Sequence, residues 1–477
     1  MLEGTCVVEF TAQHMFGKRT FGKQTFAKLI EERRGMMKFY GRQEELKELR
    51  RIRELSKGGS RFTVVTGRRR VGKTELVDRA FGDGKGAYLY LLITRRTEKD
   101  LCEMLQEEVQ KILARPILGS ATRFVQLFEA VMAYAVDVPL TLVIDEFQEL
   151  DWINPAIFGD IQGVWDRYHK KAKLNLVVCG SVNRLMNKIF FDDSQPLYGR
   201  NTGKLEVMPF TTRLTKEILK AHNPKFTKRD LLTLWALTGG VARYVELFMD
   251  EHAFTGADMI RTVFGMSSAY IDEGKVILSD EFGKEYGVYF SILSAISSGR
   301  TSFAEISNIV GEAIGGHLTK LEKSYSFISK AQPAFDRPTA RNVLYRIDDC
   351  FFRFWFRFVY RYMHLIEQKQ MRELQRVVER DFDVFAGISL ERYFRAKFIE
   401  ERRYTVAGSW WDRKGENEID LVCSNELKGT LDFYEVKMDA KRIDMNALAM
   451  KVAAFFRKHP EMQRVKFGLK GLSLEDM

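Results

Sequence analysis

Short apolar runs alternate with amphipathic stretches between residues 37 and 210. The runs are short and β-rich, which predicts buried strands. Amphipathic patterns such as Lys99–Leu113 lie between them and predict helices. Strands that alternate with helices indicate a parallel sheet with helices on both faces, which is an α/β fold. The predicted strands are Arg61–Gly67, Gly86–Thr94, Leu140–Ile144 and Leu174–Cys179.

The pattern changes after residue 210. These changes, together with the distinct start of the chain, divide the sequence into the core and five further parts. The helical part is interrupted at Thr238–Gly240, and the next part reads as three helices followed by strand-like wings, the order of a winged helix-turn-helix. The last part reads as helix, strand, loop, strand and helix. The expected parts are a poorly ordered N-terminal extension at 1–36, the core at 37–210, a helical lid at 211–284, a winged helix at 285–350, an aromatic and basic connector at 351–384 and a small α/β domain at 385–477.

The segment Gly67–Thr74 (GRRRVGKT) matches G-x-x-x-x-G-K-[ST] and lies between a predicted strand and a predicted helix. Its glycines let backbone N–H groups turn toward phosphates, where a helix N-terminus also favours anions. We expect Lys73 to contact the β/γ-phosphates and the Thr74 hydroxyl to ligate Mg²⁺; the alternative is a glycine turn that holds no ligand. The residues expected to line the nucleotide are Gly67, Arg70, Val71, Gly72, Lys73, Thr74 and Glu75.

The apolar strand in LTLVIDE ends in two carboxylates, Asp145 and Glu146. Asp145 is expected to hold the Mg²⁺ shell and Glu146 to polarise the attacking water. Acidic residues commonly follow buried strands, so this pattern is weak alone. It gains weight because it follows a phosphate-binding loop in the same alternating sheet. The two motifs together predict that the protein binds and hydrolyses ATP or GTP.

Six segments in order resemble the prokaryotic AAA+/STAND-type ATPases often described as archaeal ATPases, over roughly residues 37–350. The resemblance implies ATP as the nucleotide, with adenine contacts near Tyr40, Gly41 and Arg42. It also implies a sensor-like polar residue, Ser181, at the end of its strand. The segments are FYGRQEEL, GRRRVGKTEL, VIDEFQEL, VVCGS, PLYGR and TGGVARYVELF.

The same resemblance implies roles for two arginines. Arg200 in PLYGR would be an arginine finger that reaches a neighbouring subunit or its own γ-phosphate, and Arg243 would act from the lid as a second-sensor arginine. Both also fit ordinary surface ion pairs, which are common. Ala242 stands where the family's motif often has proline, which puts the placement of Arg243 in doubt.

Two segments raise the question of nucleic-acid binding. The winged helix offers His317, Thr319, Lys320 and Lys323 on its candidate recognition helix, which could contact DNA or could only bind a partner or close the nucleotide site. The connector interleaves aromatic residues with arginines, as in a strip that stacks bases. We favour the simpler interpretation, a helix with aromatic residues in an interdomain core. Its arginines would then form a solvated face, with Arg353, Arg357 and Arg361 in the first row and Arg372, Arg376 and Arg380 in the second.

The last part of the chain carries a candidate metal site. Asp420 ends NEID, and Glu435 and Lys437 follow in FYEVKM, where a strand would turn both side chains to one face. Oxygen ligands of this kind suit Mg²⁺ or Mn²⁺. The arrangement resembles the PD-(D/E)xK nuclease superfamily over residues 385–477. This resemblance implies that Asp420, Glu435 and Lys437 form a metal and catalytic set, with Glu391 as an acidic member on the preceding helix.

Composition limits the alternatives. Lys and Arg number 75 against 64 Asp and Glu, and the resulting charge of +11 leaves DNA binding open without deciding it. The five cysteines form no CxxC pair, which excludes a disulfide scaffold and a structural zinc module and fits a reducing, cytoplasmic compartment. No apolar run approaches the roughly 20 residues that a membrane span needs.

The sequence thus predicts an AAA+-type ATPase that couples its nucleotide state to a C-terminal domain that binds DNA and cuts it with a divalent metal. The alternative is a nucleotide-dependent switch that does not cut DNA and acts through assembly or through partner proteins. The sequence leaves open whether the chain forms a homo-oligomer.

Overall fold

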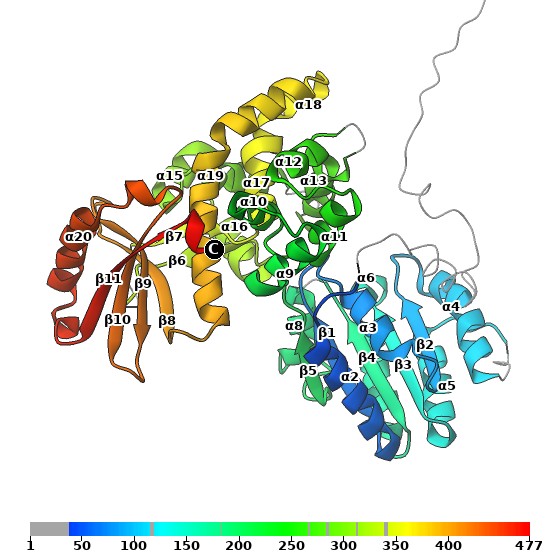
Figure 1. Ribbon diagram of the computed structural model, residues 1–477. Coiled ribbons are helices and arrows are strands. Elements are labelled where there is room, and N and C mark those ends of the chain that lie inside the picture. Colours follow the sequence, from blue (N-terminus) through cyan, green and yellow to red (C-terminus); the bar gives the residue numbers. More distant parts are fainter. Residues whose placement is uncertain are drawn as a thin grey trace, which may run out of the picture. The chain divides into compact units, whose positions relative to one another are not determined.

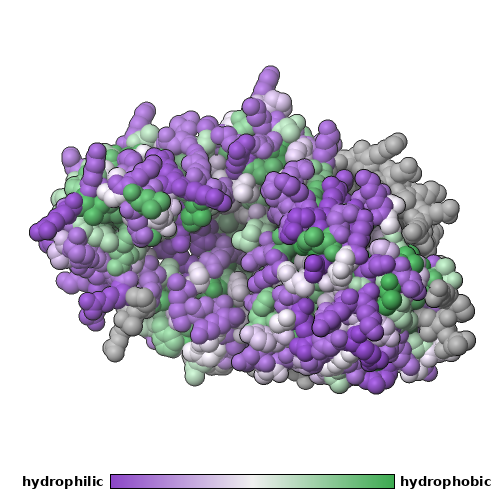
Figure 2. Space-filling view, turned by 90° about the horizontal axis from the view of Figure 1, so that it is seen from below, coloured by the Kyte–Doolittle hydropathy of each residue, from purple (hydrophilic) through white to green (hydrophobic). Residues whose placement is uncertain are grey.

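The computed structural model describes residues 38–114, 119–181, 183–265, 268–282, 286–311, 313–337 and 342–477. The extension expected at residues 1–36 lies outside these ranges. Within them, no helix is long and apolar enough to cross a membrane. Hydrophilic residues predominate on the face drawn in Figure 2, and hydrophobic residues there form only small groups.

A five-stranded parallel sheet forms the centre of the first part of the chain (Figure 1), which confirms the expected α/β fold. The strand order is β2-β3-β4-β1-β5, so the loop after β1 lies near the ends of β3 and β4. The edge strand β5 was not among the predicted strands, because it is short and its residues alternate between half-buried and exposed. The strands are β1 (Arg61–Thr66), β2 (Ala87–Leu92), β3 (Leu140–Asp145), β4 (Leu174–Cys179) and β5 (Gly203–Glu206).

Alternate side chains of the buried strands face two layers of helices. Phe62 and Val64 of β1 belong to the hydrophobic core that packs against α4, α5 and α7, whereas α2 and α3 lie on the other side (Figure 1). Strands covered on both faces read as continuous apolar runs, and this is why they could be predicted. The helices are α2 (Gln43–Leu55), α3 (Lys73–Phe81), α4 (Glu98–Leu113), α5 (Phe124–Asp137), α6 (Glu149–Ile153), α7 (Ile157–Tyr168) and α8 (Asn183–Phe191).

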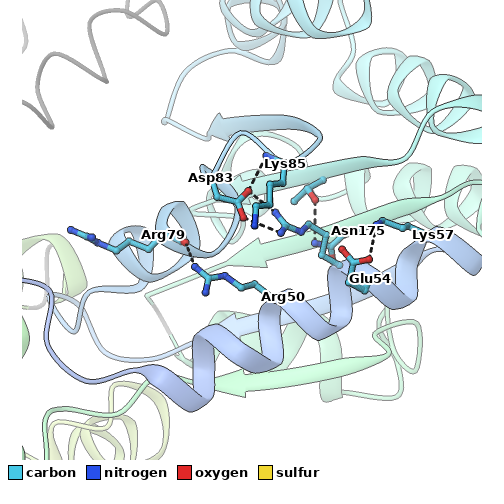
Figure 3. Close-up of polar contacts among 9 residues, drawn as sticks. Arg50, Glu54, Lys57, Arg79, Asp83, Lys85 and Asn175 are labelled. Atoms are coloured by element: carbon cyan, nitrogen blue, oxygen red, sulfur yellow. Dashed lines mark hydrogen bonds and ion pairs between the residues drawn. The ribbon is translucent and has the colours of Figure 1, made fainter.

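Polar contacts join α2 to its neighbours (Figure 3). Arg50 donates to the backbone carbonyl of Arg79, on α3, at 3.0 Å. Arg53 pairs with Asp83, beyond the end of α3, at 2.9 Å. These contacts hold α2 beside α3, whose N-terminus begins the candidate nucleotide site.

Five helices follow the sheet, where the lid was expected. The helices of the next part are followed by a two-stranded antiparallel sheet of β6 and β7, over the segment for which a winged helix was expected. The helices of the first group are α9 (Thr212–His222), α10 (Lys228–Thr238), α11 (Ala242–Asp250), α12 (Gly256–Val263) and α13 (Ala269–Phe282). The second group comprises α14 (Tyr286–Ser297), α15 (Phe303–Val310), α16 (Gly315–Thr319), the π-helical turn Lys320–Ser324, β6 (Ile328–Ala331) and β7 (Leu344–Ile347).

The aromatic connector differs from the expectation in two ways. It is not one helix but α17 (Cys350–Phe354), a π-helical turn, a 3₁₀ turn and α18 (Met363–Glu367), after which α19 (Met371–Glu400) runs across the domain boundary expected at residue 384. Most of its aromatic residues are buried as we favoured, but Arg353 is buried with them rather than solvated. Arg353 lies over the Phe385 ring at 5.0 Å, so an arginine among aromatic residues was misjudged from helical periodicity alone.

A second, four-stranded sheet occupies the C-terminal part, in the order β11-β10-β9-β8 (Figure 1). Strands β8, β9 and β10 are antiparallel neighbours, and β11 pairs parallel to β10 after the helix α20. The core of this part includes Trp410 and Phe433 from the sheet and Phe455 from α20. The elements are β8 (Val406–Trp411), β9 (Glu418–Asn425), β10 (Thr430–Lys437), α20 (Met445–Lys458) and β11 (Lys466–Ser473).

Candidate functional site

The C-terminal ends of β1, β3 and β4 bring the predicted nucleotide motifs to one edge of the first sheet. Gly67 follows β1, Asp145 ends β3 and Ser181 follows β4. Gly67 has a φ of 147°, and a Cβ atom there would lie 2.5 Å from the carbonyl oxygen of Val207. The position therefore requires glycine, and the loop turns sharply away from the strand at this point.

Lys73 begins helix α3 directly after Gly72, whose φ is 89°. Its ammonium donates to the backbone carbonyls of Gly67 at 2.8 Å and Arg68 at 3.1 Å. Lys73 is only 7% exposed, and burial lowers its pKa. The loop thus wraps around its own lysine, and the charge lies at the N-terminus of a helix, where anions are favoured.

Asp145 connects three elements of the site. Its Oδ2 atom accepts hydrogen bonds from the Thr74 hydroxyl at 2.8 Å and from the Tyr90 hydroxyl at 2.6 Å. The Thr74 and Asp145 oxygens are ligands of the kind that Mg²⁺ prefers, and they lie close enough to share one ion. Sequence reasoning missed Tyr90, although the alternation in AYLYLL indicates that it shares a strand face with Tyr88.

Glu146 has a φ of 54°, which is uncommon for a residue with a side chain. Its carboxylate accepts a hydrogen bond from the Ser181 hydroxyl at 2.9 Å and another from Gln148 at 2.5 Å. Backbone strain of this kind persists where surrounding contacts hold it in place, and it is frequent at active sites. The structure brings Ser181 to the carboxylate predicted to act on water, and it adds Gln148 as a partner.

The expected adenine-contacting residues lie beside the phosphate-binding loop. Arg42 donates to the carbonyl of Val71 at 3.2 Å and to that of Met208 at 2.6 Å. The hydroxyl of Tyr40 lies 3.4 Å from Nε2 of His222. Gly41 has a φ of 64°, a left-handed backbone conformation that glycine adopts without steric cost. Of the other predicted loop residues, Glu75 pairs with Arg79 along α3 at 2.8 Å and is directed away from the loop.

The side chains of the two predicted arginines, Arg200 and Arg243, do not lie at the phosphate loop. Arg200 pairs with Asp166 at 2.9 Å, and it precedes β5, whereas the loop follows the other end of the neighbouring strand β1. This placement excludes contact with its own γ-phosphate. The side chain of Arg243 pairs with Glu246, but its backbone N–H donates to the carbonyl of Arg70 at 3.0 Å. Helix α11 therefore contacts the loop through its first turn.

Two arginines within the loop connect it to later parts of the chain, which the sequence did not predict. Arg70 has a φ of 70° and pairs with Glu273 of α13 at 2.8 Å. Arg68 forms an ion pair with Asp349. The same carboxylate caps α17, because its Oδ1 accepts from the backbone N–H of Phe352 at 3.1 Å.

In the second sheet, the predicted carboxylate–lysine set comes together on β9 and β10. Lys437 lies 2.7 Å from Oε1 of Glu435 and 3.3 Å from Oδ2 of Asp420. Lys451 of α20 holds the other oxygen of Glu435 at 2.9 Å, and sequence reasoning missed this second lysine. Only the helical periodicity of α20 could have indicated Lys451, because the residue lies on the side of that helix that faces the sheet.

Glu391 of α19 lies near the same set. Burial raises its pKa to about 8, and the negative charges of Asp420 and Glu418 add to the effect. Burial also raises the pKa of Glu418. No group of three His, Cys, Asp or Glu side chains within the described ranges is arranged to hold a metal ion. A divalent ion here would depend on Asp420 and Glu435, with water or substrate oxygens completing its shell, as is common for Mg²⁺.

The four residues expected to lie on a recognition helix have different surroundings. His317 is half-buried, with its ring 5.2 Å from that of Tyr289 in a T-shaped contact. Thr319, Lys320 and Lys323 are exposed. Three of the four predicted side chains are thus accessible to a partner, and His317 instead packs within the domain.

Comparison with known proteins matches two parts of the chain. Residues 39–248 match the model of an ATPase domain found predominantly in Archaea, and residues 355–448 match that of archaeal and bacterial proteins of unknown function. An uncharacterised protein of Methanocaldococcus jannaschii is 27% identical over 413 residues, which is 84% of this chain and 87% of the relative. Residues 39–248 are therefore similar to ATPase domains that occur predominantly in Archaea.

Two solved structures were found to be similar to the chain. A Walker-type ATPase of Pyrococcus abyssi, 18% identical, has a TM-score of 0.52 and covers 67% of this chain and 96% of its own. The ORC2 protein of Aeropyrum pernix, solved in ADPNP–ADP complexes, is 12% identical with a TM-score of 0.43, over 72% of this chain and 96% of its own. The likeness to the Pyrococcus protein supports a P-loop ATPase fold.

Proposed function

We propose that the protein hydrolyses ATP at the edge of the first sheet and that the nucleotide state controls a C-terminal domain that binds and cleaves DNA. One observation carries the first half: Lys73, Thr74, Asp145 and Glu146 converge from α3 and β3, with Thr74 and Asp145 joined at 2.8 Å. Phosphoryl transfer needs this combination of a phosphate-binding cation, a metal-binding pair and a group that orients water.

Each residue has a separate part in this account. Lys73 would exchange its bonds to the loop carbonyls for bonds to phosphate oxygens, and Arg42 would fix the loop through the Val71 carbonyl. Mg²⁺ bound at Thr74 and Asp145 would neutralise charge on the phosphates. Glu146, held by Ser181 at 2.9 Å, would orient the attacking water and take up its proton.

ATP hydrolysis is tested by phosphate release from the full chain and from Lys73→Ala. We expect the variant to lose hydrolysis, because its loop cannot neutralise the phosphates. Lys85→Ala is a suitable control, since Lys85 is exposed and lies beyond the end of α3. Hydrolysis by Lys73→Ala at the wild-type rate would place the reaction elsewhere.

Coupling to the rest of the chain would run through the loop arginines. Arg70 reaches α13 and Arg68 reaches the cap of α17, so the loop that would enclose the phosphates also holds two later helices. A nucleotide that draws either guanidinium toward its phosphates would change these ion pairs. A conformational response of this type needs a differential contact in the two states, and the arginines supply one.

DNA cleavage is proposed for the carboxylate–lysine set of β9 and β10. Asp420 and Glu435 are oxygen donors that suit Mg²⁺ or Mn²⁺, and such an ion would activate water for attack on a phosphodiester. Lys437, bonded to both carboxylates, would hold positive charge beside the phosphate. The likeness of the D…ExK spacing to nucleases supports this half by analogy of fold.

The test is nicking of supercoiled plasmid with Mg²⁺ or Mn²⁺, with and without ATP, for the wild type and Lys437→Ala. Lys441→Ala, an exposed lysine nearby, is the control. We expect Lys437→Ala to lose cleavage and Lys441→Ala to retain it. Equal cleavage by both variants would contradict the assignment.

One observation favours a second candidate, a nucleotide-dependent switch that does not cut DNA. Lys437 and Lys451 neutralise Glu435 from both sides, at 2.7 and 2.9 Å, so the carboxylates are stably paired with no metal ion. If the plasmid stays intact under every metal while ATP hydrolysis persists, the switch is the better account.

A further inference from the structure

Four arginines from three elements gather beside the carboxylate–lysine set. Arg346 is on β7, Arg353 on α17, and Arg392 and Arg395 on α19. We call these four residues the arginine cluster. Of the four, only Arg353 was singled out from the sequence, where helical periodicity predicted that it lies on a solvated face.

Hydrogen bonds hold the cluster together. Arg392 donates to the carbonyl of Ile347 at 2.7 Å, which is the residue after Arg346. Arg353 donates to the Ser389 hydroxyl at 3.4 Å, and Ser389 lies one helical turn before Arg392 on the same face of α19. Arg395 follows one turn later. The end of β7 and the start of α17 are therefore both fixed against one face of α19.

The cluster has no ion-pairing partner within the described ranges. None of its four guanidiniums lies within 4.0 Å of a carboxylate oxygen there, whereas most described arginines between residues 39 and 248 form ion pairs. The contacts of Arg346 and Arg353 are instead with the faces of Trp411 at 5.2 Å and Phe385 at 5.0 Å. The pKa values of Arg346 and Arg353 are each lowered, first by burial and next by the charge of Arg392, and the carboxylates of Glu391, Glu418 and Asp348 offset part of this positive charge from beyond ion-pair distance.

Gathering unpaired guanidiniums in one place costs free energy, and an anion bound among them would recover it. Guanidinium groups present planar pairs of donors that match phosphate oxygens, often in bidentate fashion. The four arginines differ in their exposure to solvent. Arg353 is 8% exposed, Arg346 and Arg392 are half-buried, and Arg395 is exposed. A ligand could therefore reach it from solvent.

We propose that the arginine cluster is a phosphate-binding site. The phosphate would belong to a nucleic-acid backbone, because the cluster adjoins the sheet proposed to cleave DNA: Arg346 lies over the ring of Trp411 on β8 at 5.2 Å, and Trp411 pairs with Glu418 on β9, two residues before Asp420. This assignment of the source rests on the proposed function, whereas the phosphate chemistry does not. A phosphodiester held here would lie beside Asp420 and Lys437.

The test measures binding of a short labelled DNA duplex to the full chain in EDTA, which separates binding from cleavage. The variants are Arg392→Gln and Arg395→Gln, and the second is safe for folding because Arg395 is exposed. Arg376→Gln is the matched control: Arg376 is on the same helix, its side chain is 73% exposed, and it pairs with Glu373 on the helix surface. Thermal unfolding of each variant shows whether it is folded.

We expect each cluster variant to bind the duplex about tenfold more weakly, and the slope of log affinity against log salt to decrease by about one, because one phosphate contact is lost. Arg376→Gln should bind like the wild type. A second arm measures inorganic phosphate by calorimetry; phosphate binding that both cluster variants lose, with duplex affinity unchanged, would assign the site to free phosphate. Unchanged binding of both probes by folded Arg392→Gln and Arg395→Gln would overturn the proposal.

Failure of this inference is distinguishable from failure of the proposed function. Loss of cleavage in Lys437→Ala with normal duplex binding concerns the carboxylate–lysine set alone. Loss of duplex binding in Arg395→Gln, measured in EDTA, concerns the arginine cluster alone.

Discussion

Arg68, in the loop after β1, and Asp349, at the start of α17, form an ion pair that joins the edge of the first sheet to the helix after β7. The Asp349 carboxylate is 7% exposed and also caps α17 through the Phe352 N–H. One carboxylate therefore responds to the loop and determines how the helix begins. The ion pair thus connects the loop after β1 directly to the C-terminal half of the chain.

We expect Arg68→Ala to loosen α17. Leaving a buried carboxylate without its charged partner costs about 1–3 kcal/mol, so the backbone amides of α17 should exchange with solvent about fivefold to a hundredfold faster. Binding of an ATP analogue should alter this exchange in the wild type and leave it unaltered in the variant. Arg53→Ala breaks the comparable Arg53–Asp83 pair at 2.9 Å without touching α17, and it should behave like the wild type. A nucleotide response in Arg68→Ala equal to that of the wild type would refute this route of coupling.

Tyr90→Phe should weaken Mg²⁺ binding at the nucleotide site. The Tyr90 hydroxyl donates to Asp145 at 2.6 Å, and partners of this kind orient a ligating carboxylate, with losses of about ten- to a hundredfold in metal affinity on mutation. The concentration of Mg²⁺ that half-saturates ATP hydrolysis is the measurement. Tyr88→Phe is the control on the same strand, since the Tyr88 hydroxyl is buried without a hydrogen-bond partner in the described part of the chain. Equal Mg²⁺ dependence in the two variants would argue against a role for Tyr90.

Arg200 is expected to act between subunits, because it cannot reach its own phosphate loop. Mixing Arg200→Ala protein with Lys73→Ala protein should then restore hydrolysis that neither variant has alone, as each supplies what the other lacks. The half-exposed Asp166 should be dispensable, so Asp166→Asn serves as a control that breaks the ion pair but keeps the cation. If no mixing ratio restores hydrolysis, Arg200 does not act between subunits and serves only as the ion-pair partner of Asp166.

Local patterns were sufficient for the parts of the molecule that follow from neighbouring residues. The buried strands around Val64 and Val143 are covered on both faces, so their apolar runs were unambiguous. Gly67 and Lys73 were identified because the chemistry of phosphate binding fixes their spacing. The same is true of Glu435 and Lys437, which are two positions apart on one strand.

Contacts between distant residues could not be predicted in this way. Nothing in the sequence indicates that Arg68 pairs with Asp349. Arg68 follows β1 and Asp349 precedes α17, and no local pattern relates the two positions. Tyr90 reads as an ordinary strand residue until β2 is placed beside β3. Arg353 shows why helical periodicity misled: the helix is interrupted by a π-helical turn at Trp355–Val359, which changes the face that each residue presents.

The variant Glu146→Gln tests most directly whether Glu146 acts on water at a site that binds ATP through Lys73. The amide keeps the size and the contact with Ser181 but cannot take up a proton. Binding of labelled ATP and its single-turnover hydrolysis should be measured on the same preparation. We predict ATP affinity close to that of the wild type and hydrolysis slowed about a hundredfold or more. Hydrolysis at the wild-type rate would contradict the account.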